Sequence, residues 1–210
     1  MIISKTPLRI SFVGGGSDLP SFYEKPQDGG AVVTTAIDKY IYVTVNKKFD
    51  NNIRVRYSKT EEAQEVSQIE HPIVREVLKK LKVNGVEITS IADIPSTGTG
   101  LGSSSAFTVG LLNALYAYQQ KFISAHDLAN MACQIEIDTL KEPMGKQDQF
   151  GTAFGGLKFL TFHPNGQVSV DPIFCLRETR EAIQRNMLLL YTGITRSASK
   201  ILAKQKSNMQ

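Results

Sequence analysis

The chain has 210 residues, of which 41% are hydrophobic and 21% are charged, and its formal net charge is +4. These values indicate one large globular domain, or one domain and part of another, and they exclude wholesale disorder. Lysine and arginine are scattered along the sequence, whereas a nucleic-acid surface needs them clustered on one face, so we expect no nucleic-acid partner.

The cysteines and the apolar segments indicate the cellular compartment in which the protein is expected. Cys133 and Cys175 are far apart and form no CxxC pair, which is typical of a protein in a reducing environment. Cys133 lies in an apolar helical pattern and is predicted to be a buried thiol. The N-terminus has no signal-peptide pattern, and no apolar stretch approaches membrane-spanning length. We therefore expect a soluble, cytoplasmic protein without a membrane partner.

The first half of the chain is predicted to be rich in strands. Alternating or β-branched residues predict strands over 9–13, 31–37, 40–45 and 53–57. Residues 73–81 follow a proline and have helical spacing, and residues 86–91 return to a strand pattern.

The second half is more helical. Residues 103–118 are apolar nearly all round, which predicts a buried helix. Ser124 and Asp127 form a capping signature for a second helix. Residues 157–162 and 187–191 are predicted to be strands, and residues 196–206 a short amphipathic helix. The mixture predicts an α+β fold, with a sheet-rich first part and helices packed on it.

A glycine- and serine-rich loop precedes the buried helix. Its glycines alternate with other residues, which leaves backbone N–H groups free to form a concave nest for anions. The loop leads into a helix N-terminus, where unpaired N–H groups and the helix dipole favour phosphate. The alternative is an ordinary turn with Ser103 as the N-cap. The candidate nucleotide-binding residues are Pro95, Gly98, Gly100, Leu101, Gly102, Ser103, Ser104 and Ser105.

Three segments, in the order found in the family, resemble motifs of the GHMP kinases. They are the loop 95–106, the N-terminal segment 6–18 with its Pro7-Leu8-Arg9-Ile10 run, and the segment 136–150 with Gly145-Lys146-Gln147-Asp148-Gln149. The resemblance implies ATP and Mg²⁺ as cofactors and a small-molecule acceptor. It further implies an N-terminal domain of ribosomal-protein-like β-α topology and a ferredoxin-like C-terminal domain.

Residues 7–20 resemble the sugar-1-kinase branch of that family, in particular kinases of D-glycero-D-manno-heptose 7-phosphate. This implies phosphorylation of the anomeric hydroxyl of a sugar or sugar phosphate. Where galactokinases have a Glu-His pair beside the sugar, this chain has Gly15 and Gly16. We therefore expect added space for a larger substituent, such as a heptose side chain.

The resemblance assigns the catalytic roles to Asp148 and Arg9. A carboxylate beside the acceptor hydroxyl can orient it or take its proton. Arg9 would lie across the site and neutralise that carboxylate or the transferred phosphoryl group. The alternatives are an Asp148 that caps a turn and an Arg9 that is a surface cation.

Magnesium and the sugar are expected to bind nearby. Glu136 and Ser104 offer the hard oxygen atoms that Mg²⁺ prefers, although an exposed helical glutamate is the alternative reading of Glu136. Asp18, with Ser17, Gly15 and Gly16, is expected to contact the sugar. Asp18 could instead be a helix N-cap.

A substrate phosphate needs a cation, and the sequence does not choose among the candidates. The three histidines have no ligand-like spacing, and we assign them no metal or acid–base role. The candidate cations are Lys39, Arg54, Arg56, Lys146 and Arg196.

By resemblance, residues 1–175 are the nucleotide- and sugar-binding domain, and residues 176–210 begin a truncated second domain. The family's third glycine-rich motif is not found, so the chain is expected to be incomplete and to have little activity alone. An apolar face left by a missing domain would favour association, for example as a homodimer. Two other functions stay open: a kinase for fucose, galactose or an acyclic alcohol such as mevalonate, and a catalytically silent module that binds nucleotide or sugar.

Overall fold

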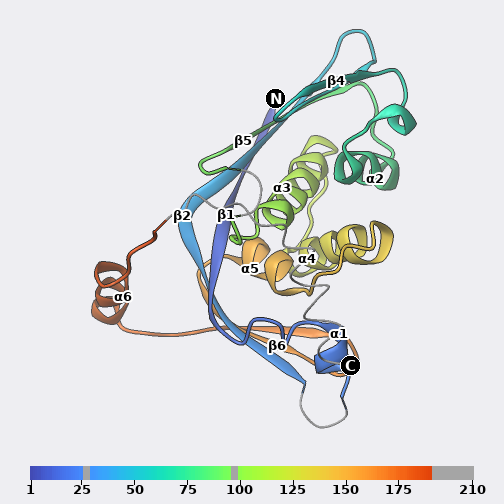
Figure 1. Ribbon diagram of the computed structural model, residues 1–210. Coiled ribbons are helices and arrows are strands. Elements are labelled where there is room, and N and C mark those ends of the chain that lie inside the picture. Colours follow the sequence, from blue (N-terminus) through green and yellow to red (C-terminus); the bar gives the residue numbers. More distant parts are fainter. Residues whose placement is uncertain (26–28, 96–98, 191–210) are drawn as a thin grey trace.

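The computed structural model describes residues 1–25, 29–95 and 99–190, which form a layered α+β structure (Figure 1). Seven strands form one sheet in the order β4-β3-β5-β2-β6-β7, with β1 paired to β2 outside that path. Among the strands within these residues, β3 and β5 alone pair in parallel. The α+β class is therefore confirmed. The strands are β1 (Ile2–Val13), β2 (Gly30–Lys47), β3 (Ile53–Arg56), β4 (Thr60–Ala63), β5 (Val86–Ala92), β6 (Leu157–Phe162) and β7 (Val168–Pro172).

Strand β2 organises the sheet, because three other strands pair with it. β1 follows one edge of β2, while β5 pairs with residues 41–47 and β6 with residues 30–35. The sequence predicted two strands here, 31–37 and 40–45, but they are one continuous strand. The two predicted strands are separated by the polar pair Asp38-Lys39. This pair lies where β1 shifts its register between Pro7 and Arg9, so the strand continues through it.

Helices α2, α3, α4 and α5 lie on one face of the sheet, and α6 lies on the opposite side (Figure 1). A π-helix, Gln134–Thr139, extends α4. Among the described residues, no helix is long and apolar enough to cross a membrane. The helices are α1 (Pro20–Tyr23), α2 (Pro72–Leu81), α3 (Ser103–Tyr118), α4 (Ala125–Cys133), α5 (Gln147–Phe154) and α6 (Arg177–Arg185), with a 3-10 turn at Val66–Gln68.

Helix α3 lies at the centre of the core. Ten of its residues are buried, including Leu111, Leu112 and Leu115, so the predicted all-round burial is confirmed. Gly110 allows α3 to approach β1 closely, because a Cβ atom there would lie 2.7 Å from the Thr6 hydroxyl. The capping prediction for α4 is also confirmed, since Ser124 Oγ accepts a hydrogen bond from the Asp127 N–H.

The C-terminal part differs from the sequence prediction. Residues 187–190, expected to form a strand, have no regular structure, and the side chains of Leu188 to Leu190 are exposed. A run of leucines fits a strand only if a neighbouring strand pairs with it, and none of the described strands does. The predicted helix 196–206 lies outside the described residues. The predicted domain boundary at 175 falls between β7 and α6.

Candidate functional site

A register shift in the sheet aims two polar side chains of β1 at the helical layer. Before the shift, the buried positions alternate as expected at Ser4, Thr6 and Leu8. The next residue, Arg9, is also buried and reaches helix α5, and Ser11 follows it on that side. Bulges commonly redirect side chains in this way beside active sites. Strict alternation would have placed Arg9 on the opposite face from Leu8.

Arg9 binds the carboxylate of Asp148. Its Nε and Nη2 atoms donate hydrogen bonds of 2.8 and 2.6 Å to the same oxygen, Oδ1. Asp148 lies in the first turn of α5, and the two side chains are 10% and 16% exposed. No hydrogen bond from residues 1–25, 29–95 or 99–190 reaches the other oxygen, Oδ2. A general base needs a carboxylate oxygen that can accept a hydrogen bond from the hydroxyl it deprotonates.

The glycine-rich loop is hydrogen-bonded to the same arginine, Arg9. The backbone N–H of Arg9 donates to the carbonyl of Leu101 (3.2 Å), and Nη1 donates to the carbonyl of Gly100 (2.9 Å). Gly102, with φ of 75°, is the N-cap of α3, so the alternative in which Ser103 caps the helix is wrong. Arg9 thus joins the loop to Asp148. Gly98 lies outside the described residues, and Pro95 is exposed at their edge.

Glu136 is buried, with 1% exposure, where the π-helix meets the start of α3. The alternative of an exposed helical glutamate is therefore wrong. Each of its carboxylate oxygens accepts two hydrogen bonds. Oε1 accepts from Ser104 (2.9 Å) and Thr108 (3.0 Å), and Oε2 accepts from Ser105 (2.8 Å) and Gln149 (2.6 Å).

Burial raises the pKa of the Glu136 carboxyl, and the four hydrogen bonds act against that shift. Among the described residues, no group of three or more His, Cys, Asp and Glu side chains could hold a metal ion. A magnesium ion that also binds phosphate oxygens needs only one or two protein carboxylates. The Ser104 hydroxyl and Glu136 fit that requirement, provided that Ser104 gives up its hydrogen bond to Glu136.

The turn between β1 and α1 is compact. Asp18 is 2% exposed and accepts hydrogen bonds from the N–H of Gly16 (3.1 Å) and from Gln147. It does not cap α1, whose N-cap is Leu19, so that alternative is wrong. The Ser17 hydroxyl is bonded to the backbone of Gly14 and Ala31 and ties the turn to β2.

The two glycines of this turn differ. A Cβ atom at Gly15 would meet no atom within 4 Å, which is consistent with open space beside the turn. Gly16 has φ of 93°, so its backbone conformation by itself explains the glycine.

Most candidate cations have partners of their own. Arg54 and Arg56 form ion pairs with Glu62 and Glu87 on the sheet, as expected for the wet face of a strand. Lys146 donates to the carbonyl of Gly166 (2.6 Å). Lys39 is exposed, and Arg196 lies outside the described residues.

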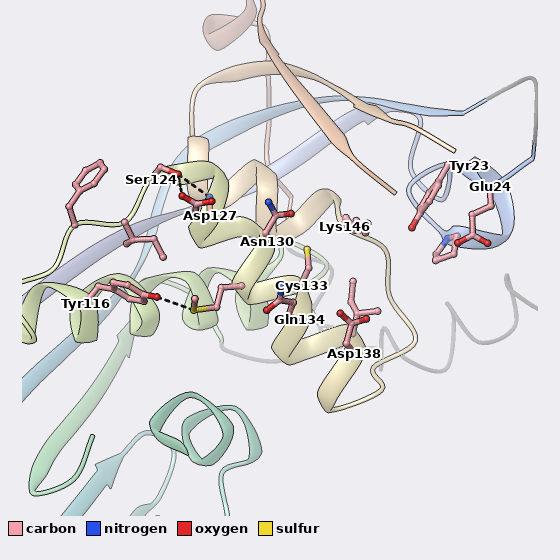
Figure 2. A pocket seen from close by; sticks show the side chains of 15 residues that line it. Tyr23, Glu24, Tyr116, Ser124, Asp127, Asn130, Cys133, Gln134, Asp138 and Lys146 are labelled. Atoms are coloured by element: carbon pink, nitrogen blue, oxygen red, sulfur yellow. Dashed lines mark hydrogen bonds between the residues drawn. The ribbon is translucent and has the colours of Figure 1, made fainter. Parts of the chain in front are cut away.

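A separate cavity of about 870 Å³ lies on the other side of the π-helix (Figure 2). Tyr23 of α1 and the following residue, Glu24, line one side, and Gln134 and Asp138 of the π-helix line another. Glu136 points away from this cavity toward α3. Of the predicted site residues, only the candidate cation Lys146 lines the cavity.

Sequence reasoning did not assign roles to four polar residues of the site. They lie within or beside the motifs, but a motif match alone does not show which side chains meet. A polar side chain inside an otherwise apolar helix, as at Thr108, was the one available signal, because such groups need a partner when buried. The four are Ser11, Thr108, Gln147 and Gln149.

Comparison with known proteins gives a family match. Residues 68–156 match the family described as GHMP kinases N terminal domain. D-glycero-alpha-D-manno-heptose 7-phosphate kinase of Campylobacter jejuni is 29% identical over an alignment of 223 positions, and the alignment covers 99% of this chain. The chain spans 64% of that relative, less than two thirds of its length.

Two further matches agree with this one. L-fucokinase/L-fucose-1-P guanylyltransferase of Bacteroides fragilis is 27% identical, and the match covers 100% of this chain and 26% of the relative. The crystal structure of a D-glycero-D-manno-heptose 1-phosphate kinase from Bacteroides thetaiotaomicron aligns with a TM-score of 0.82 at 26% identity. That alignment covers 100% of this chain and 71% of the other.

Proposed function

We propose that the chain belongs to an ATP-dependent sugar kinase of the GHMP type that acts on an anomeric hydroxyl, and the match of residues 68–156 to the GHMP kinases N terminal domain supports this proposal. The observation that carries the proposal is the link from the glycine loop through Arg9 to Asp148. It connects a helix N-terminus, where phosphate binding is favoured, to a carboxylate that could act on an acceptor hydroxyl, and this supports the proposal.

In this proposal the nucleotide phosphates lie against the loop from Gly100 to Ser105. The acceptor hydroxyl donates its proton to Asp148 Oδ2 as its oxygen attacks the γ-phosphorus and ADP leaves. Arg9 fixes the carboxylate through Oδ1 and leaves Oδ2 open. Ser104 and Glu136 would hold magnesium, which neutralises phosphate charge during the transfer.

The substrate that we propose is D-glycero-D-manno-heptose 7-phosphate, which would become the 1,7-bisphosphate. The name of the Campylobacter jejuni relative, which specifies heptose 7-phosphate, supports this choice. The name of the Bacteroides thetaiotaomicron structure specifies heptose 1-phosphate, so it supports the heptose but not the position of the phosphate. The open space beside Gly15 is consistent with a substituent larger than that of a hexose. Fucose, galactose and mevalonate are the competing acceptors, and a silent binding module is the non-enzymatic alternative.

The test is ADP release with ATP, Mg²⁺ and a panel of sugars and sugar phosphates, made with the chain and its Asp148→Asn variant. We expect turnover with the heptose phosphate and a loss of about 100-fold or more in the variant, as for removal of a general base. Equal rates with galactose and the heptose would contradict the substrate assignment. A variant that keeps its rate would contradict the role of Asp148.

The space beside Gly15 has its own test. Gly15→Glu should lower kcat/KM for the heptose phosphate more than for galactose, because the added side chain fills the space proposed for the larger substituent. Gly15→Ala, with only one added carbon, is the matched control for the backbone change. A parallel loss with both sugars would show that this position does not select the substrate.

A further inference from the structure

Gln147, the residue before Asp148, connects three segments of the site. Its backbone N–H donates to Asp18 Oδ2 (3.1 Å), and its side-chain Nε2 donates to Asp18 Oδ1 (3.2 Å). Its Oε1 atom accepts from the hydroxyl of Ser11 on β1 (2.9 Å). One amide therefore bridges β1, the turn before α1 and the start of α5.

The Asp18 carboxylate has little freedom to move away from this bridge. The N–H of Gly16 donates to Oδ1 from within the turn, and Gly145 packs so closely that a Cβ atom there would lie 2.0 Å from Oδ2. Burial raises the pKa of the Asp18 carboxyl, and the hydrogen bond from the Gln147 N–H opposes that shift. The nearby charge of Asp148 raises it further.

We propose that Gln147 is a positioning residue that holds the Asp18 carboxylate at a fixed place beside Asp148. The turn that carries Gly15 and the helix that carries the catalytic carboxylate are then held as one unit. The inference rests on the proposed function, because it assigns sugar binding to that turn. It also gives Ser11 a part, since the Ser11 hydroxyl fixes the orientation of the amide: Oε1 faces the hydroxyl donor and Nε2 faces Asp18.

Two substitutions separate the bonds that Gln147 makes. Gln147→Met keeps the length of the side chain and the backbone N–H bond, but it removes the Nε2 donor and the acceptor for Ser11. Gln147→Glu keeps an acceptor for Ser11 and places a carboxylate oxygen against Asp18. Gln64→Met, at an exposed position beyond β4, is the control for the same chemical change elsewhere.

The direct measurement is the titration of the Asp18 carboxyl carbon by NMR in this chain. We expect a higher Asp18 pKa in Gln147→Met, because the ionised form loses a donor, and a larger increase in Gln147→Glu. In the ADP-release assay, KM for the sugar should rise about tenfold in Gln147→Met, the equivalent of one hydrogen bond to a charged group. KM for ATP should stay unchanged.

An unaltered Asp18 titration in Gln147→Met would overturn the proposal, whatever the activity. The proposal would also be overturned if the Asp18 titration shifted in Gln147→Met while the kinetic constants of that variant equalled those of Gln64→Met. If Gln147→Met does not fold, Ser11→Ala gives the second test, because it frees the amide with a smaller change. If the wild-type chain turns over no sugar, the proposed function fails, while the Asp18 titration still decides whether Gln147 holds that carboxylate.

Discussion

Both hydrogen bonds from the Arg9 side chain to Asp148 end on one carboxylate oxygen, although the residues are 139 positions apart in the sequence. The third nitrogen of the guanidinium, Nη1, donates to the carbonyl of Gly100. All three guanidinium nitrogens of Arg9 therefore donate hydrogen bonds that hold Asp148 and the glycine-rich loop in place. This arrangement favours a role in orienting Asp148 and the loop over direct binding of the transferred phosphoryl group.

Removal of Arg9 should destabilise the fold as well as slow the reaction. Arg9→Met keeps most of the side-chain length but leaves the part-buried Asp148 carboxylate and the Gly100 carbonyl without donors. We expect the free energy of unfolding to fall by about 2 kcal/mol, the cost of leaving such groups unpaired. Urea denaturation of the chain and the variant measures this difference.

The coupling between the two residues has a separate test. Asp148→Asn should cost less stability in the Arg9→Met background than in the wild type, because the partner of the carboxylate is already gone. Additive costs would show that the two hydrogen bonds contribute nothing to stability. Arg75→Met is the matched control, since the guanidinium of Arg75 donates to the Glu76 carboxylate and to the carbonyl of Ile69, away from the site.

The local elements could be predicted where pattern and packing agree. Residues 103–118 and 157–162 match α3 and β6, because an all-round apolar run and a short strand pattern leave few alternatives. The strand expected at 187–191 shows the limit. A leucine run has the local preference for a buried element, but only pairing with a neighbour makes it a strand, and pairing is not encoded locally.

The sequence pointed to residues that the fold brings together, but not to the geometry in which they meet. The motifs pointed to Arg9 and Asp148, which the fold brings within hydrogen-bond distance. The register shift that turns Arg9 toward the helices depends on how many residues β2 inserts opposite Leu8, and β1 alone gives no sign of it. Gln147 was missed for a similar reason, because its partners come from segments more than 100 residues away.

Burial of Glu136 predicts a particular pH dependence of stability. Its folded pKa is raised above the ordinary value of 4.5, so the unfolded chain releases this proton more readily than the folded one. The folded state is therefore favoured most below the ordinary pKa, and that contribution is lost as pH rises through the raised pKa. Glu136→Gln has no such proton to lose.

The stability advantage of the wild type over Glu136→Gln should therefore shrink as pH rises above about 4.5, the ordinary pKa of glutamate. Urea denaturation at a series of pH values measures the free energy of unfolding of both proteins. The pH-dependent contribution of Asp18 is present in both and cancels in the difference. Asp138→Asn removes a carboxylate from the exposed side of the same helix and is the control for charge alone. A difference that does not change with pH would contradict the burial argument.

Close packing of Gly145 against Asp18 gives the last prediction. An alanine there would place its Cβ atom 2.0 Å from Oδ2 and 2.3 Å from Cγ of Asp18, so the carboxylate must move. We expect Gly145→Ala to lower the free energy of unfolding by about 2 kcal/mol, as overpacking does in well-packed cores. Gly15→Ala meets no atom within 4 Å and should leave stability nearly unchanged. Thermal unfolding of the two variants compares them directly. Equal stabilities would mean that the turn carrying Asp18 can move away from the added Cβ atom at little cost in free energy. The Asp18 carboxylate would then not be held at a fixed position, which contradicts a rigid sugar site.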